Sequence, residues 1–331
     1  MISTPEKITI LNATTAFISM ISLSRSKNTA RTYQNGLDHL LAVIESHKIN
    51  PKETTIDQIN EDVIIWLSDS LKNQSPATER LYLTAASAFF EYLAAENLAN
   101  INLPRVRLLI RQRARRPGIR LPQFPKDAIE TVIERITAPD IKLYETEQEK
   151  LRLLRDRAFL VTLADTGLRV HEACKLRRGD IDWSENRAII IGKGNKEAVV
   201  RFSQRSMQLL REYLAARSRL DGNSGRPLSA LPVFARHDRG AGKSIKAMTT
   251  TTGRNIVTEW VNHLLGPEAA GTITPHSFRH YFVTRVLQSS GNLKLAQELA
   301  RHQNIAITQR YAHLSNDELD QGYWQAFEEK N

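Results

Sequence analysis

Cysteine is almost absent from this chain, since Cys174 is the only one in 331 residues. One thiol excludes an internal disulfide framework and a cysteine-rich zinc site, and its helical-looking surroundings predict a small buried side chain. A run of about twenty apolar residues that could cross a membrane is also missing. The mildly apolar stretch 8–23 carries Thr, Asn and Ser and lacks a clear cleavage site. We therefore expect no signal peptide, no membrane association and a cytoplasmic protein.

Two common enzyme signatures are missing as well. Gly242-Lys243-Ser244 resembles the end of a phosphate-binding P-loop, but His237 occupies the position where that motif needs its first glycine. The Gly-x-Ser-x-Gly elbow of serine hydrolases does not occur. These absences disfavour a nucleotide hydrolase and a serine esterase.

A zinc site on a helix is also disfavoured. His276 and His280 have the spacing of two zinc ligands, but the residue in the general-base position between them is Ser277 rather than Glu. A third ligand would have to come from His302 or His313. We expect no metal and no cofactor.

Positive charge is in excess. Lysine and arginine number 46 against 36 acidic residues, a formal net charge of +10. This excess predicts a polyanionic partner, nucleic acid ahead of an anionic membrane surface. The alternative is a basic enzyme with no polyanion to bind. The length is sufficient for two domains.

Residues 1–103 have the pattern of a helical bundle. Apolar residues recur at helical spacing from about residue 28 to 46, 57 to 67 and 76 to 98. Pro76 stands in the first turn of the third segment, where its missing N–H does no harm. A bundle of this size does not by itself reveal a function.

Residues 104–125 form an arginine- and proline-rich segment that we interpret as a linker. Four prolines favour an extended chain, and arginines without interleaved acids repel one another unless a polyanion neutralises them. We expect contact with a DNA backbone; the alternative is a solvated tether. The arginines are Arg105, Arg107, Arg111, Arg113, Arg115, Arg116 and Arg120.

Residues 126–331 combine helices with a small sheet. The predicted helices are 127–136, 147–166, 203–219 and 252–265. The β-branched runs 187–191 and 197–202 predict a hairpin, with glycines in the turn between them. Residues 222–243 have the composition of a loop.

Four short motifs in this second region have residue types suited to phosphate chemistry. The first is Thr166-Gly-Leu-Arg-Val-His-Glu172, in which Glu172 follows Arg169 by one helical turn. Lys193 stands in the hairpin turn, and His276 and Arg279 project from one helix face. His302 and Tyr311 complete the series: guanidinium groups hold an anion, imidazoles move protons and a phenol can attack.

The order and spacing of these motifs resemble the tyrosine recombinase (phage integrase) family, most closely its Xer-like branch. The resemblance covers essentially the whole chain. It implies a mainly α fold with a small β-sheet: a helical, SAM-like core-binding domain and an α+β catalytic domain that form a C-shaped clamp on double-stranded DNA. It also implies a homo-tetramer or hetero-tetramer on two DNA sites, with accessory proteins in some cases.

The resemblance also implies how the strand is cut. Tyr311 would attack a backbone phosphate and form a 3′-phosphotyrosyl bond, releasing a 5′-hydroxyl. Lys193 would protonate the leaving oxygen, and His276 would assist proton transfer at the tyrosine. Because the covalent bond conserves the energy of the broken phosphodiester, neither ATP nor metal is required.

The remaining residues of the set would stabilise charge. Arg169, Arg279 and His302 would hold the non-bridging phosphate oxygens as negative charge builds up. Glu172 would orient Arg169 without acting directly.

The chain departs from the Xer-like pattern in three places. Arg301 precedes His302 where the pattern commonly has Gly, and segments 140–149 and 222–243 are longer than in a minimal member. The acidic, aromatic tail 314–331 has the composition of a docking helix, for a neighbouring protomer or for its own domain. Two other functions stay open: a type IB topoisomerase-like nicking-closing enzyme and a catalytically idle DNA-binding relative.

Overall fold

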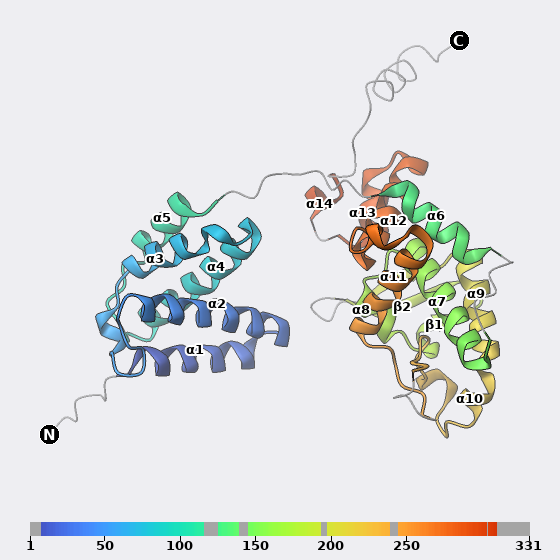
Figure 1. Cartoon of the computed structure of the whole chain (residues 1–331), viewed down its shortest axis with the longest axis horizontal. Helices are drawn as coiled ribbons and strands as arrows, with labels where there is room; N and C mark the ends of the chain where they lie inside the picture. Colours follow the sequence, from blue (N-terminus) through green and yellow to red (C-terminus); the bar gives the residue numbers. More distant parts are fainter. Residues whose placement is uncertain are drawn as a thin grey trace, which may run out of the picture. The chain divides into compact units, whose positions relative to one another are not determined.

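The computed structural model describes residues 8–115, 125–138, 145–192, 197–238, 244–302 and 304–309 (Figure 1). The chain divides into two compact units, residues 1–120 and 121–331. Within the described ranges, no helix has both the length and the apolar content needed to cross a bilayer.

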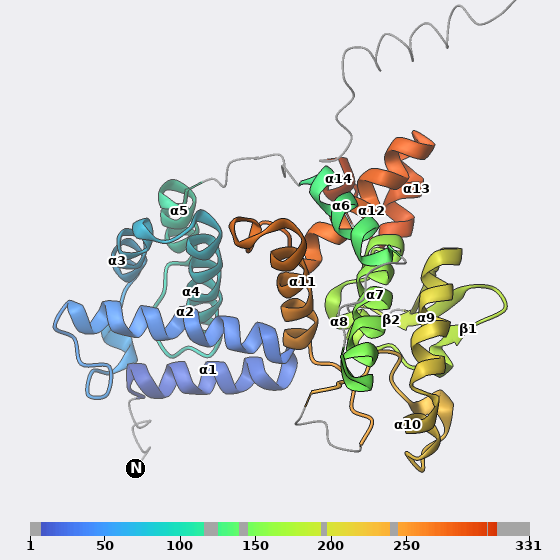
Figure 2. The same cartoon turned by 45° about the vertical axis from the view of Figure 1, so that its right-hand side comes forward.

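The N-terminal unit is built from helices. They are α1 (Ile10–Ser24), α2 (Lys27–Ser46), η1 (Ile56–Gln58), α3 (Asp62–Ser70), η2 (Leu71–Asn73), α4 (Pro76–Ala95) and α5 (Leu103–Arg113). Helices α1 and α2 lie side by side in both views (Figures 1 and 2). The ring of Phe17 on α1 lies 5.6 Å from that of Phe89 and 5.3 Å from that of Tyr92, both on α4. Aromatic contacts therefore join the first helix to the fourth.

Local signals set where these helices begin. Ser26 and Ser75 accept hydrogen bonds from the backbone N–H groups of Thr29 and Thr78, and so cap α2 and α4. The predicted helices agree with α2 and α4, but the helix predicted from about residue 57 to 67 is wrong at its start, because the chain forms η1 there and α3 begins at Asp62. The observed cap of α2 is Ser26, which lies before the predicted start at residue 28.

Helix α5 corrects the extended conformation expected for the arginine-rich segment, which is wrong for Leu103–Arg113. Pro104 lies in the first helical turn, where a missing N–H costs nothing, and the Asn102 side chain caps the helix by accepting from the Arg105 N–H. Val106 is fully buried in the core of the N-terminal unit. The burial of Val106 and the Asn102 cap stabilise the helix, although the prolines of this segment favour an extended chain.

The C-terminal unit combines helices with one sheet. The helices up to the sheet and just after it are α6 (Lys126–Thr137), α7 (Glu147–Thr166), α8 (Val170–Lys175), η3 (Arg178–Asp180), α9 (Gln204–Ala216) and α10 (Ser218–Gly222). Those that follow are η4 (Leu228–Ala230), α11 (Thr250–Leu265), η6 (Pro267–Ala269), α12 (Pro275–Ser290), α13 (Leu293–Ala300) and α14 (Ile305–Gln309).

The sheet has three antiparallel strands in the order β1-β2-β3: β1 (Ile181–Asp182), β2 (Arg187–Ile191) and β3 (Glu197–Arg201). Ile191 pairs with Glu197 at one end of the β2–β3 ladder and Arg187 pairs with Arg201 at the other. The predicted hairpin is confirmed in its strands and pairing; its turn, 193–196, lies outside the described residues.

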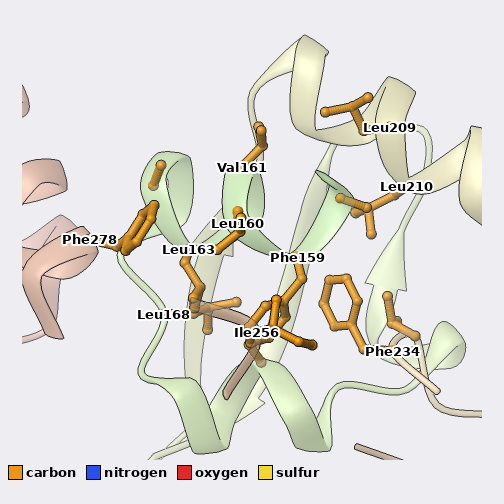
Figure 3. Packing of buried hydrophobic residues seen from close by; sticks show 14 of the residues in the cluster. Phe159, Leu160, Val161, Leu163, Leu168, Leu209, Leu210, Phe234, Ile256 and Phe278 are labelled. Carbon is orange, nitrogen blue, oxygen red and sulfur yellow. The ribbon is translucent and has the colours of Figure 1, made fainter. Parts of the chain in front are cut away.

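Helix α7 is the centre of the C-terminal core. It contacts both α9 and α12 (Figure 2), and Phe159, Leu160 and Leu163 on it are fully buried (Figure 3). Phe234, from the segment 222–238, meets Phe159 edge to face with ring centroids 5.1 Å apart. This packing holds α7 rigidly against the helices that carry the motifs.

A buried polar cluster fastens the same segment to α9. Arg217 has no exposed surface, and its guanidinium donates to Asp221, to the Tyr213 hydroxyl and to two backbone carbonyls. The Tyr213 hydroxyl lies 2.8 Å from His237 Nε2. The described part of the 222–243 segment is therefore an integrated part of the core.

Cys174 is buried, as predicted. Its thiol points at the Thr249 carbonyl 3.5 Å away, at the start of α11. Gly253 on α11 packs against it so closely that an added Cβ would lie 3.1 Å from the sulfur. Burial raises the pKa of the Cys174 thiol to about 11, so the group is unreactive in the folded protein.

Candidate active site

Arg169 and Glu172 lie at the turn between α7 and α8. Arg169 is the N-cap residue of α8, and its backbone N–H donates to Glu172 Oε2 at 2.8 Å. Its Nη1 donates to Glu172 Oε1 at 2.9 Å. The Glu172 side chain is 2% exposed and that of Arg169 is 38% exposed. A buried carboxylate thus holds a guanidinium that still faces solvent.

Gly167 makes this turn possible. It has φ +60°, which favours glycine, and an added Cβ would lie 2.4 Å from Phe282 Cδ1 on α12. Its carbonyl accepts from Arg279 Nη1 at 2.5 Å and from Arg301 Nη2 at 3.3 Å. One backbone oxygen therefore links α12 and the end of α13 to the turn that carries Arg169.

Helix α12 supplies His276 and Arg279. Arg279 is buried, and its second terminal nitrogen donates to the Ala300 carbonyl at the end of α13. The rings of His276 and His280 stand edge to face, 4.3 Å apart. Two carbonyl contacts hold the Arg279 guanidinium in one orientation before any ligand arrives.

His302 follows α13 directly. Its Nδ1 lies 2.9 Å from the Thr308 hydroxyl on α14, and its backbone carbonyl accepts from the Gln297 side chain at 3.1 Å. The hydrogen bond at Nδ1 orients the ring and leaves Nε2 as the nitrogen available to a ligand.

The pKa values show that the arginines and histidines of the site are close together. Burial, reinforced by the charges of Arg169 and Arg301, lowers the pKa of Arg279 to about 9. Burial and the charge of Arg279 likewise lower the pKa of His302 to about 4. An entering phosphate would supply the missing negative charge and reverse these shifts.

The remaining imidazoles respond in the same way. Burial and the charges of Arg279 and Arg169 lower the pKa of His276. Burial and the neighbouring His276 lower that of His280 to about 4. At neutral pH, His276 is therefore an uncharged imidazole that can accept a proton.

The carboxylate in this cluster is kept ionised. Burial alone would raise the pKa of Glu172, but the charge of Arg301 and hydrogen bonds from Arg169 outweigh it and hold the pKa below its ordinary value. Among the described residues, no group of three or more His, Cys, Asp and Glu side chains is arranged to hold a metal ion.

Comparison with known proteins gives the family. The model of the Phage integrase family matches residues 135–318, and that of the Phage integrase N-terminal SAM-like domain matches residues 15–97. The chain belongs to the phage integrase family. The resemblance stated above, and the mainly helical two-part architecture that it implies, are thereby confirmed.

Relatives within the phage integrase family are recombinases. "Tyrosine recombinase XerC" of Thermodesulfovibrio yellowstonii is 29% identical over 317 residues, 93% of this chain and 94% of the relative. "Tyrosine recombinase XerC" of Vibrio cholerae serotype O1 is 34% identical over 185 residues, covering 56% of this chain and 55% of the relative.

Solved structures share the fold. The XerH site-specific recombinase bound to palindromic difH substrate has a TM-score of 0.66 at 20% identity, covering 89% of this chain and 79% of that one. The Tn1549 transposon integrase in complex with transposon right end DNA has a TM-score of 0.63 at 20% identity, with coverages of 97% and 99%.

Two residues of the expected integrase set lie outside the described residues. Lys193 falls in the turn between β2 and β3, and Tyr311 follows α14. Their roles stay predictions, as does the docking role of the tail 314–331. The structure does bring together Arg169, Glu172, His276, Arg279 and His302.

Two further residues belong to this cluster. In the sequence, Arg301 stands out only as a departure from the family pattern, and His280 only as half of a disfavoured zinc pair. A signal for Arg301 existed in the sequence, because a long cation stood where a helix end favours glycine. Its partner Glu172 is far away in the chain and could not be deduced from local spacing.

The arginines of segment 104–125 are placed differently from those of the site. Arg105 pairs with Glu61 and Asp62 at 2.9 and 2.6 Å. Arg107 reaches Glu91 at 3.1 Å, and Arg113 reaches Asp69 at 3.5 Å. Their partners all belong to the N-terminal unit.

Arg115 has the most buried partner of this group. It pairs with Glu79, whose side chain has no exposed surface and also accepts from Lys72 at 3.0 Å. Arg116 and Arg120 lie outside the described residues. The assumption that these arginines lack neighbouring acids is therefore wrong for four of them, because the acids come from distant parts of the chain.

Proposed function

We propose that the protein is a site-specific DNA recombinase that cleaves and rejoins strands through a 3′-phosphotyrosyl intermediate. Membership of the phage integrase family and the XerC relatives support this proposal. The observation that carries it is the meeting of Arg169, Arg279 and His302, from three separate segments, around the Gly167 turn. Two preorganised guanidinium groups and an imidazole that can form a hydrogen bond stabilise a phosphate that gains charge in the transition state.

In the proposed cleavage step, the Tyr311 phenolic oxygen attacks phosphorus while the bond to the 5′-oxygen breaks. The phenolic proton passes towards neutral His276, and Lys193 gives a proton to the leaving 5′-oxygen. Arg169 and Arg279 hold the non-bridging oxygens. A free phenol with a pKa near 10 is a weak nucleophile at neutral pH, so surrounding positive charge favours the reaction.

Rejoining is the reverse reaction. The 5′-hydroxyl of a strand attacks the phosphotyrosyl bond, and Tyr311 leaves with its proton restored. The number of phosphoester bonds is unchanged, so the cycle needs no external energy source.

The partner in this proposal is double-stranded DNA. Its sequence support is the net charge of +10, and the solved structures with the same fold include DNA complexes. The resemblance to the family leads us to expect four protomers, alike or of two kinds, on two duplexes, with accessory proteins in some cases. We also propose that the enzyme acts in the cytoplasm.

The test is a suicide substrate. A duplex that binds the protein is first selected from a random-sequence library. Versions of this duplex that carry a nick at successive backbone positions are then prepared. This set is called the nicked duplex. We expect a covalent protein–DNA adduct that survives denaturant and disappears in Tyr311→Phe. Tyr323→Phe, a tyrosine change later in the same tail, is the matched control and should retain the adduct. Equal adduct in Tyr311→Phe and wild type would exclude Tyr311 as nucleophile.

Lys193 is tested separately. Lys193→Ala should slow cleavage by about 10²- to 10⁴-fold, the usual contribution of a general acid. Replacing the bridging 5′-oxygen with sulfur, a better leaving atom, should restore much of the rate. Lys196→Ala changes a second lysine of the same turn and should leave the rate near wild type. If sulfur brings no rescue, Lys193 is not the general acid.

The two rival functions give different products. A type IB topoisomerase-like enzyme would relax supercoiled DNA as a monomer without joining two sites. An idle relative would bind the duplex without any adduct. Recombinant junctions from two labelled duplexes would support the recombinase.

A further inference from the structure

Arg301 has an unusual backbone. It ends α13 with φ +57° and ψ +43°, the left-handed conformation that glycine adopts readily and other residues adopt at a cost. An arginine that keeps this conformation needs a compensating interaction elsewhere in the fold. We expect the Arg301 side chain to make this compensating interaction.

The side chain of Arg301 is directed into the candidate active site. It is 12% exposed, and Nη2 donates to Glu172 Oε2 at 3.0 Å and to the Gly167 carbonyl at 3.3 Å. Nε and Nη1 are buried and have no hydrogen-bond partner among the described residues. Burying these two donors unpaired is unfavourable, so the contact with Glu172 must outweigh it.

Glu172 thereby joins two guanidinium groups. Its Oε1 accepts from Arg169 Nη1, and its Oε2 accepts from the Arg169 N–H and from Arg301. A carboxylate held at both oxygens cannot rotate, and this in turn fixes the Arg169 guanidinium that faces solvent.

We propose that Arg301 is a positioning residue for strand cleavage, which acts by locking Glu172 and through it Arg169. This inference rests on the proposed recombinase function. Direct contact with DNA is disfavoured, because Nε and Nη1 are buried and Nη2 already donates to Glu172 and to the Gly167 carbonyl.

The test measures single-turnover cleavage of the nicked duplex together with DNA affinity. Arg301→Gly relieves the left-handed conformation, so the variant should fold. We expect its cleavage rate to fall about 10- to 100-fold, the usual effect of losing a residue that orients an active-site group, with DNA affinity nearly unchanged. Arg301→Lys keeps the charge and should recover part of the rate.

A double-mutant cycle separates positioning from direct contact. In a Glu172→Gln background, Arg301→Gly should cause little further loss, because its action passes through Glu172. Losses that multiply in the double variant would overturn the inference in favour of a direct contact. A cleavage rate of Arg301→Gly equal to wild type would overturn it in favour of a neutral replacement.

Two controls complete the experiment. Lys48 is an exposed cation with φ +63° in the N-terminal unit, and Lys48→Gly should leave cleavage unchanged. Absence of any adduct in wild type would contradict the proposed function itself. If the wild type forms the adduct and Arg301→Gly cleaves at the wild-type rate, only the role proposed for Arg301 is contradicted.

Discussion

The arginines around α5 and those of the candidate active site are neutralised to different degrees. In the N-terminal unit, Arg105 and Arg115 each meet a carboxylate from another helix, and the ion pairs fasten α5 to its own unit. In the C-terminal unit, Arg169, Arg279 and Arg301 gather around a single described carboxylate, Glu172. The difference teaches that unbalanced positive charge, and not the abundance of arginine, marks the candidate site.

The largest expected effect follows from replacing one site cation. Arg279→Gln should lower the rate of nicked-duplex cleavage by about 10³-fold, because it removes a preorganised charge from the transition state. Arg105→Gln is the matched control: it removes a paired cation and should leave the cleavage step of bound DNA unchanged. Equal rate losses in both variants would remove the distinction between the two kinds of arginine.

The next effect concerns the turn that gathers the site cations. Gly167→Ala should destabilise the C-terminal unit by about 3 kcal/mol, because it combines a left-handed backbone with a clash against Phe282. Gly225 has φ +66° but no atom within 4 Å of an added Cβ, so Gly225→Ala should cost only about 1 kcal/mol. The free energy of unfolding of both variants is measured in urea. Equal losses of stability would show that Phe282 moves away and relieves the clash.

A smaller loss of stability is expected in the N-terminal unit. Arg115→Ala removes one of two cations from buried Glu79 and should cost about 1–2 kcal/mol, since Arg115 is itself 36% exposed and Lys72 remains. Hydrogen exchange measured by peptide should show the loss around α4 and α5. Unchanged protection there would mean that Arg115 does not fasten α5.

The two units should also differ in the pH at which acid begins to lower their stability. The pKa of His237 is lowered to about 3 by burial and by Arg155, and the pKa values of His280 and His302 to about 4. Below pH about 6.5 the unfolded chain binds protons that the folded C-terminal unit does not. Its stability therefore falls as the pH drops from about 6.5 towards these values.

The N-terminal unit has a different acid response. Burial alone would raise the pKa of Glu79, but hydrogen bonds from Lys72 and Arg115 outweigh it and hold the pKa below 4.5. This contribution is lost only as the pH falls below about 4.5. Peptide-resolved hydrogen exchange at pH 5.5 should thus show weakening in the C-terminal unit first; simultaneous weakening would contradict the expected order.

The smallest expected effect tests DNA contact by the arginine-rich segment. Arg107 and Arg111 line an open groove of about 430 Å³ with Tyr33, Thr84 and Glu91, the ion-pair partner of Arg107, and both arginine side chains are exposed. We propose these two as phosphate contacts. Their double change to Gln should reduce the slope of log affinity against log salt by about 0.9 for each contact. An unchanged slope would leave both as solvated surface residues.

Much of the architecture was predictable because its signals are local. Thr146 and Glu149 form a capping box at the start of α7 and Gly167 ends it, so the predicted limits 147–166 agree with the helix. The β2–β3 hairpin follows from β-branched runs around glycines. Helix α5 has two local start signals, the Asn102 cap and Pro104 in the first turn, but the prolines and arginines of its segment favour an extended chain. Its contact from Arg105 to Glu61 comes from distant sequence.

The same limit applies to the site. The motif Thr166–Glu172 and the His276–Arg279 spacing pointed to phosphate chemistry, since each pair lies within one helical turn. The meeting of Glu172 with Arg301 depends on how α8 and α13 pack, which no spacing in the sequence records.

The lone thiol of Cys174 is a natural reporter of motion in the catalytic unit. It is buried beneath α11, where Gly253 packs against it, and its pKa of about 11 keeps it protonated and unreactive in the folded protein. A thiol reagent can reach it only when the packing around Cys174 opens, and every modified molecule carries one label. When modification is faster than reclosing, the labelling rate of the unaltered protein equals the rate of opening, and slower labelling with DNA present would show that DNA stabilises the packing around this thiol.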